Sequence, residues 1–290
     1  EEDFNRAMHE TIASIQKAKL TNSIPFSVFK PTGLAKFDLL VKISSKKQLS
    51  ESEKKEKINF EFRVESICKV SKENNIPVFI DAEESWVQNA IDEIALKMMK
   101  KFNTEKTLIF NTVQLYRKDR ISYIEKLLLN RKKNKFFIGL KLVRGAYHEQ
   151  EIARAKKMGY PCPVHIAKRD TDKDYNAALS MCIKNINIIS ICAGTHNEES
   201  SALLIKLLKK ENIRRDDKRI YFSQLLGMSD HISYNAAKKG FNVAKYVPYG
   251  PVEDVLPYLI RRAEENTSIS GQIGRELSNI LAERKRRKKG

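Results

Sequence analysis

Residues 135–145 read "KFFIGLKLVRG", an apolar run that ends in a lysine and an arginine. A nearly continuous apolar run is typical of a strand that is buried on both faces, as in a parallel sheet. Six further stretches have the same character, and helix-like stretches stand between them. We expect the other strands near 25–30, 76–84, 107–114, 186–197, 219–227 and 242–250, and helices near 3–19, 50–74, 86–101, 119–132, 172–185, 198–210 and 230–239.

This alternation of strand and helix predicts an α/β protein with a parallel sheet covered by helices. A doubly wound open sheet could hold seven strands, whereas a closed barrel needs eight. The chain opens with a helix that no strand precedes. We therefore expect a (βα)8 TIM-like barrel whose first strand lies upstream of residue 1. We assign residues 1–281 to this barrel and residues 282–290 to a basic C-terminal tail.

Polar and ionisable side chains gather where the predicted strands end. In a barrel these ends form one bowl, in which active sites are built, whereas an open sheet spreads them along an edge. We therefore expect a single cationic bowl that holds an anionic substrate or cofactor. The residues concerned are Lys30, Asp81, Glu83, Glu84, Gln114, Lys141, Arg144, Thr195, His196, Asn197, Gln224 and Tyr246.

Each of these side chains also has a purely structural explanation. Asp81 could cap the helix that follows it, and the "THN" segment could cap the next one. Arg144 could pair with Glu149 or Glu151 on the following helix. Lys141 lies within an apolar strand, so it needs an anion or an opening beside it.

The chain is strongly basic, with a formal net charge of +18 over 290 residues. The terminal run "RKRRKK" (284–289) supplies six of these charges and could hold the protein weakly at an anionic bilayer. The remaining excess is spread along the chain without a nucleic-acid-binding motif, so we expect no nucleic acid partner. A DNA-binding protein stays open as an alternative that the charge alone suggests.

Four widely spaced cysteines without a CxxC motif predict neither a zinc site nor a disulfide framework. No apolar run is long enough for a spanning helix. We expect a cytoplasmic protein, with peripheral contact at the inner membrane, or a mitochondrial one if the source is eukaryotic. No dinucleotide-binding, P-loop, zinc-protease or nucleophile-elbow motif occurs, so the residues alone name no reaction.

Five motifs closely resemble the proline dehydrogenase family, in its monofunctional, eukaryotic-like branch. They are "DAEES" (81–85), "KLVRGAY" (141–147), "GTHNE" (194–198), "YFSQLLGMSD" (221–230) and "KYVPYGPVEDVLPYLIRRAEENTS" (245–268). The resemblance implies a (βα)8 barrel that binds FAD without a Rossmann motif. It also implies oxidation of L-proline to Δ1-pyrroline-5-carboxylate, with hydride transfer to FAD and electrons passed to quinone.

The resemblance also assigns the substrate pocket. Arg261 and Arg262 resemble the pair that holds the proline carboxylate, for which planar guanidinium groups are well matched. Lys30 is similar to the family's lysine near that carboxylate, and Asp81 to its active-site aspartate. Tyr246 resembles the tyrosine that packs on the proline ring. Tyr147 and Leu225 would line the pocket.

The expected flavin contacts come from the same resemblance. Lys141 stands near the reactive flavin edge, where many bacterial members carry an arginine, and we group it with Asp81 as catalytic. Glu265 would orient Arg261 from one helical turn away. The remaining expected contacts are Ala82, Gln114, Arg144, Gly145, Ala146, Thr195 and His196.

Two departures and two alternatives accompany this assignment. His148 replaces a tryptophan of the bifunctional branch, and residues 164–175 match only loosely. A preference for 4-hydroxyproline is the nearer alternative, although members with that preference carry a smaller residue in place of Tyr246. The more distant alternative is a Schiff-base lyase on the same barrel, with Lys30 or Lys141 as the nucleophile.

Overall fold

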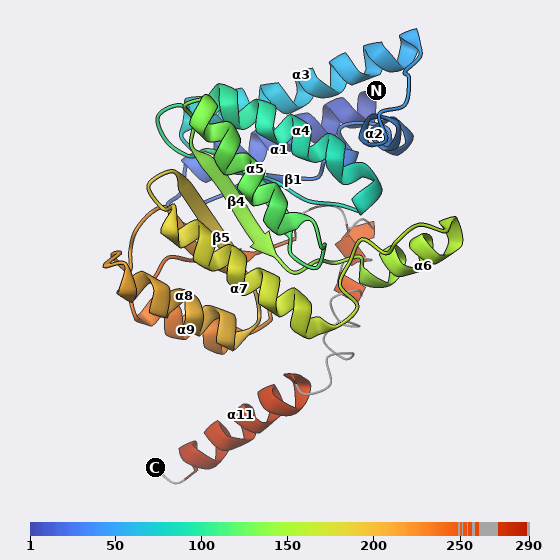
Figure 1. Ribbon diagram of the computed structural model, residues 1–290. Helices are drawn as coiled ribbons and strands as arrows, with labels where there is room; N and C mark the ends of the chain where they lie inside the picture. Colours follow the sequence, from blue (N-terminus) through green and yellow to red (C-terminus); the bar gives the residue numbers. More distant parts are fainter. Residues whose placement is uncertain (249, 251, 254, 257–258, 261–271, 289–290) are drawn as a thin grey trace. The chain divides into compact units, whose positions relative to one another are not determined.

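The computed structural model describes residues 1–248, 250, 252–253, 255–256, 259–260 and 272–288 (Figure 1). The chain divides into two compact units, residues 1–245 and residues 246–290. The first unit holds nine helices of the described part and the sheet, except for the last residue of its final strand, Tyr246. The second includes helix α11 (Gln272–Arg287), which carries part of the basic terminal run.

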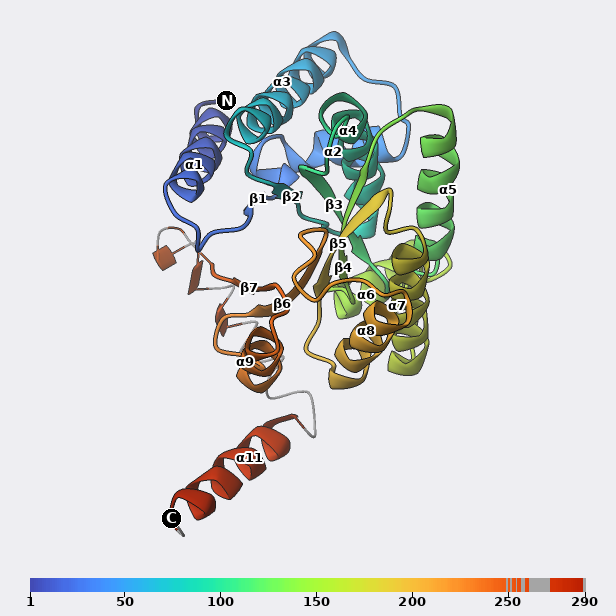
Figure 2. The same cartoon turned by 90° about the vertical axis from the view of Figure 1, so that its left-hand side faces the viewer.

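A seven-stranded parallel sheet with the strands in sequence order organises the first unit. It curls into a half-barrel, and helices cover its outer side (Figure 2). All seven predicted strands are confirmed, as is the α/β barrel-like fold class. The strands are β1 (Ser27–Phe29), β2 (Val78–Ile80), β3 (Ile109–Gln114), β4 (Ile138–Val143), β5 (Ile189–Gly194), β6 (Ile220–Leu225) and β7 (Val243–Tyr246).

The predicted helices are confirmed, and residues 1–245 hold two further helices outside the predicted ranges. The predicted ones are α1 (Glu2–Lys19), α3 (Glu51–Asn74), α4 (Ser85–Phe102), α5 (Arg120–Lys133), α7 (Lys168–Lys184), α8 (Glu198–Lys210) and α9 (Asp230–Lys238). The additional ones are α2 (Phe37–Ser44) and α6 (His148–Met158). The 3-10 turn η1 (Pro31–Gly33) follows β1.

Local sequence explains the ends of the longest helix. Ser50 accepts a hydrogen bond from the backbone N–H of Glu53, while the Glu53 side chain accepts one from the backbone of Ser50. This reciprocal arrangement satisfies two donors that the first turn of α3 would leave unpaired. At the other end Asn75 adopts a left-handed conformation, which closes the helix.

The two faces of the sheet carry different cores. The large core lies between the strands and the helices, and it includes Val78 and Ile80. The inner face carries a small aromatic layer, in which the ring of Phe79 stacks on Phe26 at 4.3 Å and meets Phe110 edge-on at 5.3 Å. Gly139 makes room for this layer, since a Cβ there would lie 2.8 Å from the Phe110 ring.

Candidate active site

The strand register brings the predicted catalytic residues onto the inner face. Phe79 pairs with Phe110, and Thr112 pairs with Lys141. Because side chains alternate between faces along a strand, Asp81 and Thr112 point to the same side as the aromatic layer. The row that contains Asp81, Thr112 and Lys141 therefore lies one step beyond that layer, toward the carboxyl ends of the strands.

Lys141 and Asp81 form a buried ion pair in this row. The Lys141 ammonium donates to Oδ1 of Asp81, and each residue is only 8% exposed. The hydroxyl of Thr112 lies 3.4 Å from the same carboxylate oxygen, and the Phe79 ring lies 5.1 Å below the ammonium. The expectation that Lys141 needs an anion is confirmed. The alternative role of Asp81 as a helix cap is not observed, because its carboxylate binds Lys141.

The end of β1 presents Lys30. Its side chain is exposed, and the turn η1 begins at the next residue. The hydroxyl of Thr32 in this turn donates to Glu83 at 2.6 Å, which ties the end of β1 to the segment after β2. Ala82, an expected flavin contact, is buried in the same segment.

Gln114 joins the ends of three strands. Its side-chain amide donates to the Glu83 carbonyl at 2.7 Å, and its side-chain oxygen accepts from the Ala146 N–H at 3.3 Å. Gly145, beside Ala146, has φ +144°, and a Cβ there would lie 2.4 Å from the Tyr116 ring. The loop after β4 thus takes a path that only glycine allows without a shift of that ring.

Arg144 is held on all three of its guanidinium nitrogens by other parts of the chain. Nε donates to Asp172 at 2.7 Å, one terminal nitrogen donates to Thr195 at 2.5 Å, and the other donates to Ser200 at 3.0 Å. The group also lies over the Tyr175 ring at 4.4 Å. The alternative pairing of Arg144 with Glu149 or Glu151 is therefore wrong.

The environment of Asp172 supports this description of Arg144. Burial alone raises the pKa of Asp172, but hydrogen bonds from Lys168 and Arg144 outweigh burial, so the pKa lies below its ordinary value. Asp172 is therefore charged at neutral pH, and Arg144 keeps a firm anionic partner.

The end of β5 is braced from two sides. The backbone carbonyl of Thr195 accepts a hydrogen bond from the side chain of Gln224 at 3.1 Å. Nδ1 of His196 lies 3.0 Å from the hydroxyl of Ser229. Asn197 caps α8 by accepting from the N–H of Ser200 at 2.8 Å, as the "THN" segment predicted.

The remaining expected pocket residues fall into two groups. Tyr147 is buried at the start of α6, Leu225 ends β6, and Tyr246 ends β7. Arg261, Arg262 and Glu265 lie outside the described residues.

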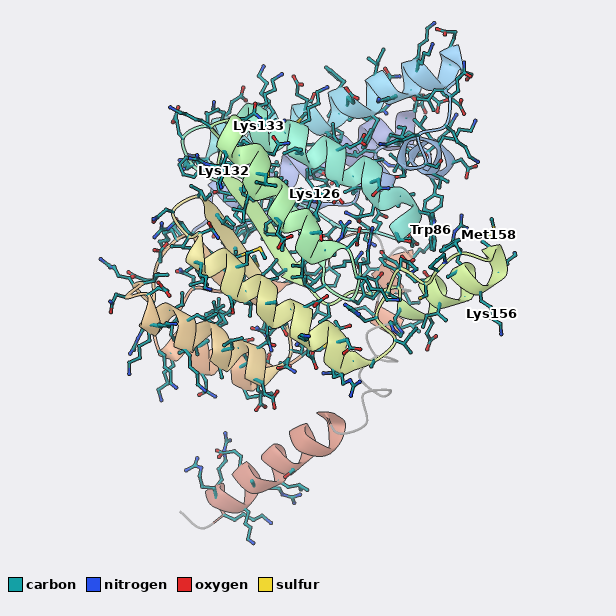
Figure 3. The ribbon with its side chains drawn as sticks, in the orientation of Figure 1. Trp86, Lys126, Lys132, Lys133, Lys156 and Met158 are labelled. Atoms are coloured by element: carbon teal, nitrogen blue, oxygen red, sulfur yellow. The ribbon has the colours of Figure 1, made fainter. Side chains whose placement is uncertain are left out.

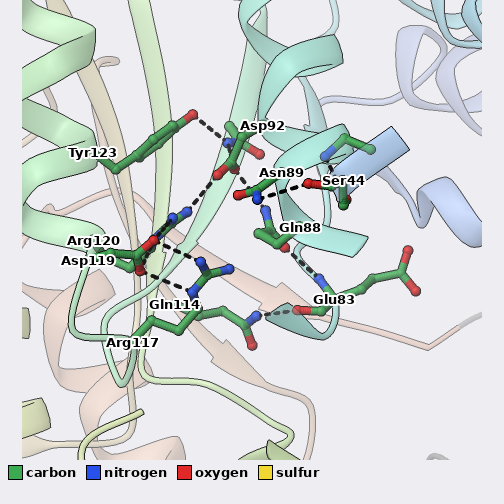
Figure 4. A network of polar contacts seen from close by, with 12 residues as sticks. Ser44, Glu83, Gln88, Asn89, Asp92, Gln114, Arg117, Asp119, Arg120 and Tyr123 are labelled. Carbon is green, nitrogen blue, oxygen red and sulfur yellow. Dashed lines mark hydrogen bonds and ion pairs between the residues drawn. The ribbon is translucent and has the colours of Figure 1, made fainter. Parts of the chain in front are cut away.

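A buried polar network behind the strand ends was not predicted from the sequence (Figure 4). Arg120 is 3% exposed and donates to Asp92 at 2.6 Å. Asp92 also accepts from the amides of Gln88 and Asn111, at 2.9 and 2.8 Å. These residues stand up to 32 positions apart, from Gln88 to Arg120, on β3, α4 and α5, and no repeating spacing connects them. Sequence periodicity therefore had no signal for them.

The described strand ends fit a bound flavin in two respects. Lys141 and Arg144 place cationic side chains, each paired with a carboxylate, at the ends of the central strands, where they can also meet an anionic cofactor. Two donors in the adjoining loop, the hydroxyl of Tyr116 and Nη1 of Arg117, are buried and have no hydrogen-bond partner among the described residues. Such buried donors normally have a partner, so this region has capacity for further polar contacts.

Residues 1–275 match the family model described as proline dehydrogenase. The chain belongs to the proline dehydrogenase family. It is 39% identical over 235 residues to "Proline dehydrogenase 1, mitochondrial" of Drosophila melanogaster, which covers 78% of this chain. That alignment spans only 34% of the fly protein, about a third of its length.

A second relative matches over nearly the whole chain. The "Carbapenem antibiotics biosynthesis protein CarD" of Pectobacterium carotovorum subsp. carotovorum is 33% identical over 99% of this chain and 74% of its own length. Among solved structures, proline utilization A from Bdellovibrio bacteriovorus matches with a TM-score of 0.80 and 21% identity. That match covers 93% of this chain and 29% of the bacterial chain, and it confirms the barrel-like fold.

Proposed function

We propose that this protein oxidises L-proline to Δ1-pyrroline-5-carboxylate with FAD held at the strand ends of the half-barrel. The observation that carries the proposal is the buried Lys141–Asp81 pair, which lies on the inner face at the carboxyl ends of the central strands. Active sites of barrel enzymes are built at this end. When bound, FAD supplies the acceptor for the hydride that leaves the ring carbon beside the proline nitrogen.

The protein's own part is to bind and orient the substrate. Arg261 and Arg262 would hold the proline carboxylate through paired N–H donors, with Lys30 as a third cation. The proline ammonium must lose a proton before or during oxidation, and nearby cations lower the pKa of an amine. Asp81 balances the charge of Lys141, so that the site is cationic without repelling itself.

The flavin contacts divide into side chains and backbone. Gln114 and Arg144 are already held by the protein, so they would meet the cofactor in fixed positions at little entropic cost. Gly145 and Ala146 are exposed beside them and offer backbone groups at close approach. Thr195 and His196 extend the same surface at the end of β5.

We propose quinone as the acceptor of the electrons. We propose an anionic membrane surface as a peripheral contact of the protein. Several curated relatives carry "mitochondrial" in their names. Lys126, Lys132 and Lys133 are exposed along α5 (Figure 3). The basic run near the C-terminus is a separate group of cations on the second unit. Within the part of the chain that the structure describes, no helix is long and apolar enough to cross a bilayer.

An absorbance spectrum of the purified protein tests the proposal, recorded before and after anaerobic addition of L-proline. We expect an oxidised-flavin spectrum that bleaches. A flavin that bleaches only with 4-hydroxyproline would move the substrate to that alternative. A preparation that stays colourless with added FAD would overturn the flavoenzyme, and borohydride trapping with a carbonyl substrate would then test the Schiff-base lyase.

Arginine variants test how the substrate is bound. Arg261→Met and Arg262→Met should each raise KM for L-proline strongly while the flavin stays bound, because a carboxylate partner is removed. Arg214→Met is the matched control, since Arg214 forms an exposed ion pair with Asp216. An unchanged KM in both site variants would contradict the assignment.

A further inference from the structure

Glu83 is a buried carboxylate among the expected bowl residues, but neither the substrate-pocket nor the flavin-contact assignment includes it. It is 4% exposed and follows the active-site aspartate Asp81 by two residues. Both of its carboxylate oxygens accept hydrogen bonds from Thr32: Oε1 from the backbone N–H at 3.0 Å, and Oε2 from the hydroxyl at 2.6 Å. Thr32 lies in the turn η1, two residues after Lys30. One side chain thus joins the turn after β1 to the end of β2.

The backbone of Glu83 is itself held on both sides. Its N–H donates to the side-chain oxygen of Gln88 at 2.9 Å, and its carbonyl accepts from Gln114 at 2.7 Å. Gln88 in turn donates to Asp92 in the buried network of Figure 4. The carboxylate of Glu83 therefore projects from a fixed main chain, and Thr32 is held against an immobile partner.

The turn η1, which Glu83 holds through Thr32, follows directly after Lys30 and supports its backbone. The Lys30 side chain is exposed, and no hydrogen bond or ion pair engages it within residues 1–248. The position of its ammonium therefore depends on the backbone that carries it. That backbone leads into one 3-10 turn of three residues, and such a turn is weak by itself. A tether from the turn to β2 reduces the volume that the ammonium can sample.

We propose that Glu83 is a positioning residue that, through Thr32, fixes the turn presenting Lys30 to the substrate carboxylate. The inference rests on the proposed oxidation of proline, in which Lys30 is a substrate contact. It gives Glu83 an indirect role, since its carboxylate oxygens are occupied by Thr32. Burial raises the pKa of Glu83, and the bonds from Thr32 and the charge of Lys30 partly offset this. Glu83 therefore also attracts Lys30 directly, and the test must separate this charge effect from the tether.

Two replacements separate the tether from the charge. Glu83→Ala removes both hydrogen bonds to Thr32. Glu83→Gln keeps both, because the amide oxygen accepts from the Thr32 N–H and the amide nitrogen donates to the Thr32 hydroxyl. If the tether acts through geometry, the glutamine variant retains the wild-type KM and the alanine variant does not.

The experiment measures KM and kcat for L-proline together with the flavin content of each purified variant. We expect Glu83→Ala to raise KM about tenfold, with kcat within about twofold of wild type and the flavin retained. Glu83→Gln should stay within about threefold of the wild-type KM. Thr32→Val removes only the hydroxyl bond, so its KM should fall between those of Glu83→Gln and Glu83→Ala. If Glu83→Ala does not fold, the KM of Thr32→Val tests the tether instead.

A double variant tests whether the effect passes through Lys30. Glu83→Ala should add nothing to the KM of Lys30→Met, because the tether then positions no ammonium. Ser50→Ala is the matched control for lost stability: it breaks the cap of α3 and should leave KM unchanged. Near-ultraviolet circular dichroism of Trp86, the single tryptophan, monitors the folding of each variant.

Three results would overturn the inference: an unchanged KM in Glu83→Ala and Thr32→Val, an equal loss of kcat and kcat/KM, or the same rise in KM with and without Lys30. A wild-type flavin that L-proline does not reduce would instead refute the proposed function, and this inference would end with it. If L-proline reduces the wild-type flavin normally and Glu83→Ala leaves KM unchanged, only the inference is refuted and the proposed function stands.

Discussion

Gly145→Ala is the substitution with the sharpest geometric consequence at the strand ends. Gly145 has φ +144°, a conformation that L-residues rarely adopt. An added Cβ would lie 2.4 Å from two atoms of the Tyr116 ring and 2.6 Å from a third. Tyr116 is 3% exposed, so its ring has no solvent-filled space into which to move.

The expected cost has two parts. A non-glycine residue in a sparsely populated backbone region costs about 1–3 kcal/mol. Overpacking a buried ring costs about 1–3 kcal/mol more. We therefore expect Gly145→Ala to lower the free energy of unfolding by about 2–6 kcal/mol. Gly159 is the matched control: its φ is +70°, a Cβ there meets nothing within 4 Å, and Gly159→Ala should cost only the backbone part, about 1–2 kcal/mol.

Urea unfolding followed by circular dichroism measures both values, and flavin absorbance measures cofactor content. The flavin content of Gly145→Ala should fall, because Gly145 and Ala146 are expected cofactor contacts. The stability costs of Gly145→Ala and Tyr116→Ala should be less than additive in the double variant, since Tyr116→Ala removes the ring that the new methyl group meets. A Gly145→Ala variant no less stable than Gly159→Ala would refute the role of this contact.

Three further outcomes are expected. Arg120→Met should lower the free energy of unfolding by about 3–5 kcal/mol, because it leaves Asp92 buried without its cation, and adding Asp92→Leu should restore much of it in urea unfolding. Burial raises the pKa of Asp119, but hydrogen bonds and charge from Arg120 and Arg117 outweigh it and hold that pKa at about 2, below the ordinary 3.8. The resulting stability is present above pH ~4 and is lost as the pH falls toward 2, so Asp119→Asn should be less stable than wild type at pH 7, with a gap that closes over this range in pH-dependent urea unfolding. Lys141→Met should slow anaerobic flavin reduction by proline about 100-fold in stopped-flow traces, whereas Lys141→Arg, which keeps the charge, should retain most of the rate.

The strands were predictable because burial on both faces requires a nearly continuous run of apolar residues. A strand covered by helices on one face and by the barrel interior on the other is expected to be apolar throughout, and residues 136–143 satisfy this with one exception, Lys141. Helix α6 was not predictable in the same way. Its sequence, "HEQEIARAKKM", is mostly polar, and its fully buried residues are only Glu151 and Ala155. Glu151 accepts two bonds from Ser85 at 2.6 Å, a contact between distant segments that periodicity cannot reveal.

The candidate site was predictable in its residue types but not in its pairs. An ammonium in an apolar strand demanded an anion, yet only the register of β2, β3 and β4 shows that Asp81, 60 residues away, provides it. Arg144 shows that closeness in the sequence can also suggest the wrong partner. Nearby Glu149 and Glu151 were the obvious partners by sequence distance, but Asp172 on α7 is the residue that Arg144 contacts.

The polar strand ends serve two physical purposes, and the two glutamines separate them. Gln114 on β3 donates to the carbonyl of Glu83, and Gln224 on β6 donates to the carbonyl of Thr195. Each carbonyl belongs to the segment just past the preceding strand, where the backbone leaves the ladder and still needs a buried donor. An amide satisfies that need without adding charge. The charged strand ends, Lys141 foremost, are not required for this purpose, and they are therefore the side chains whose presence the chemistry must explain.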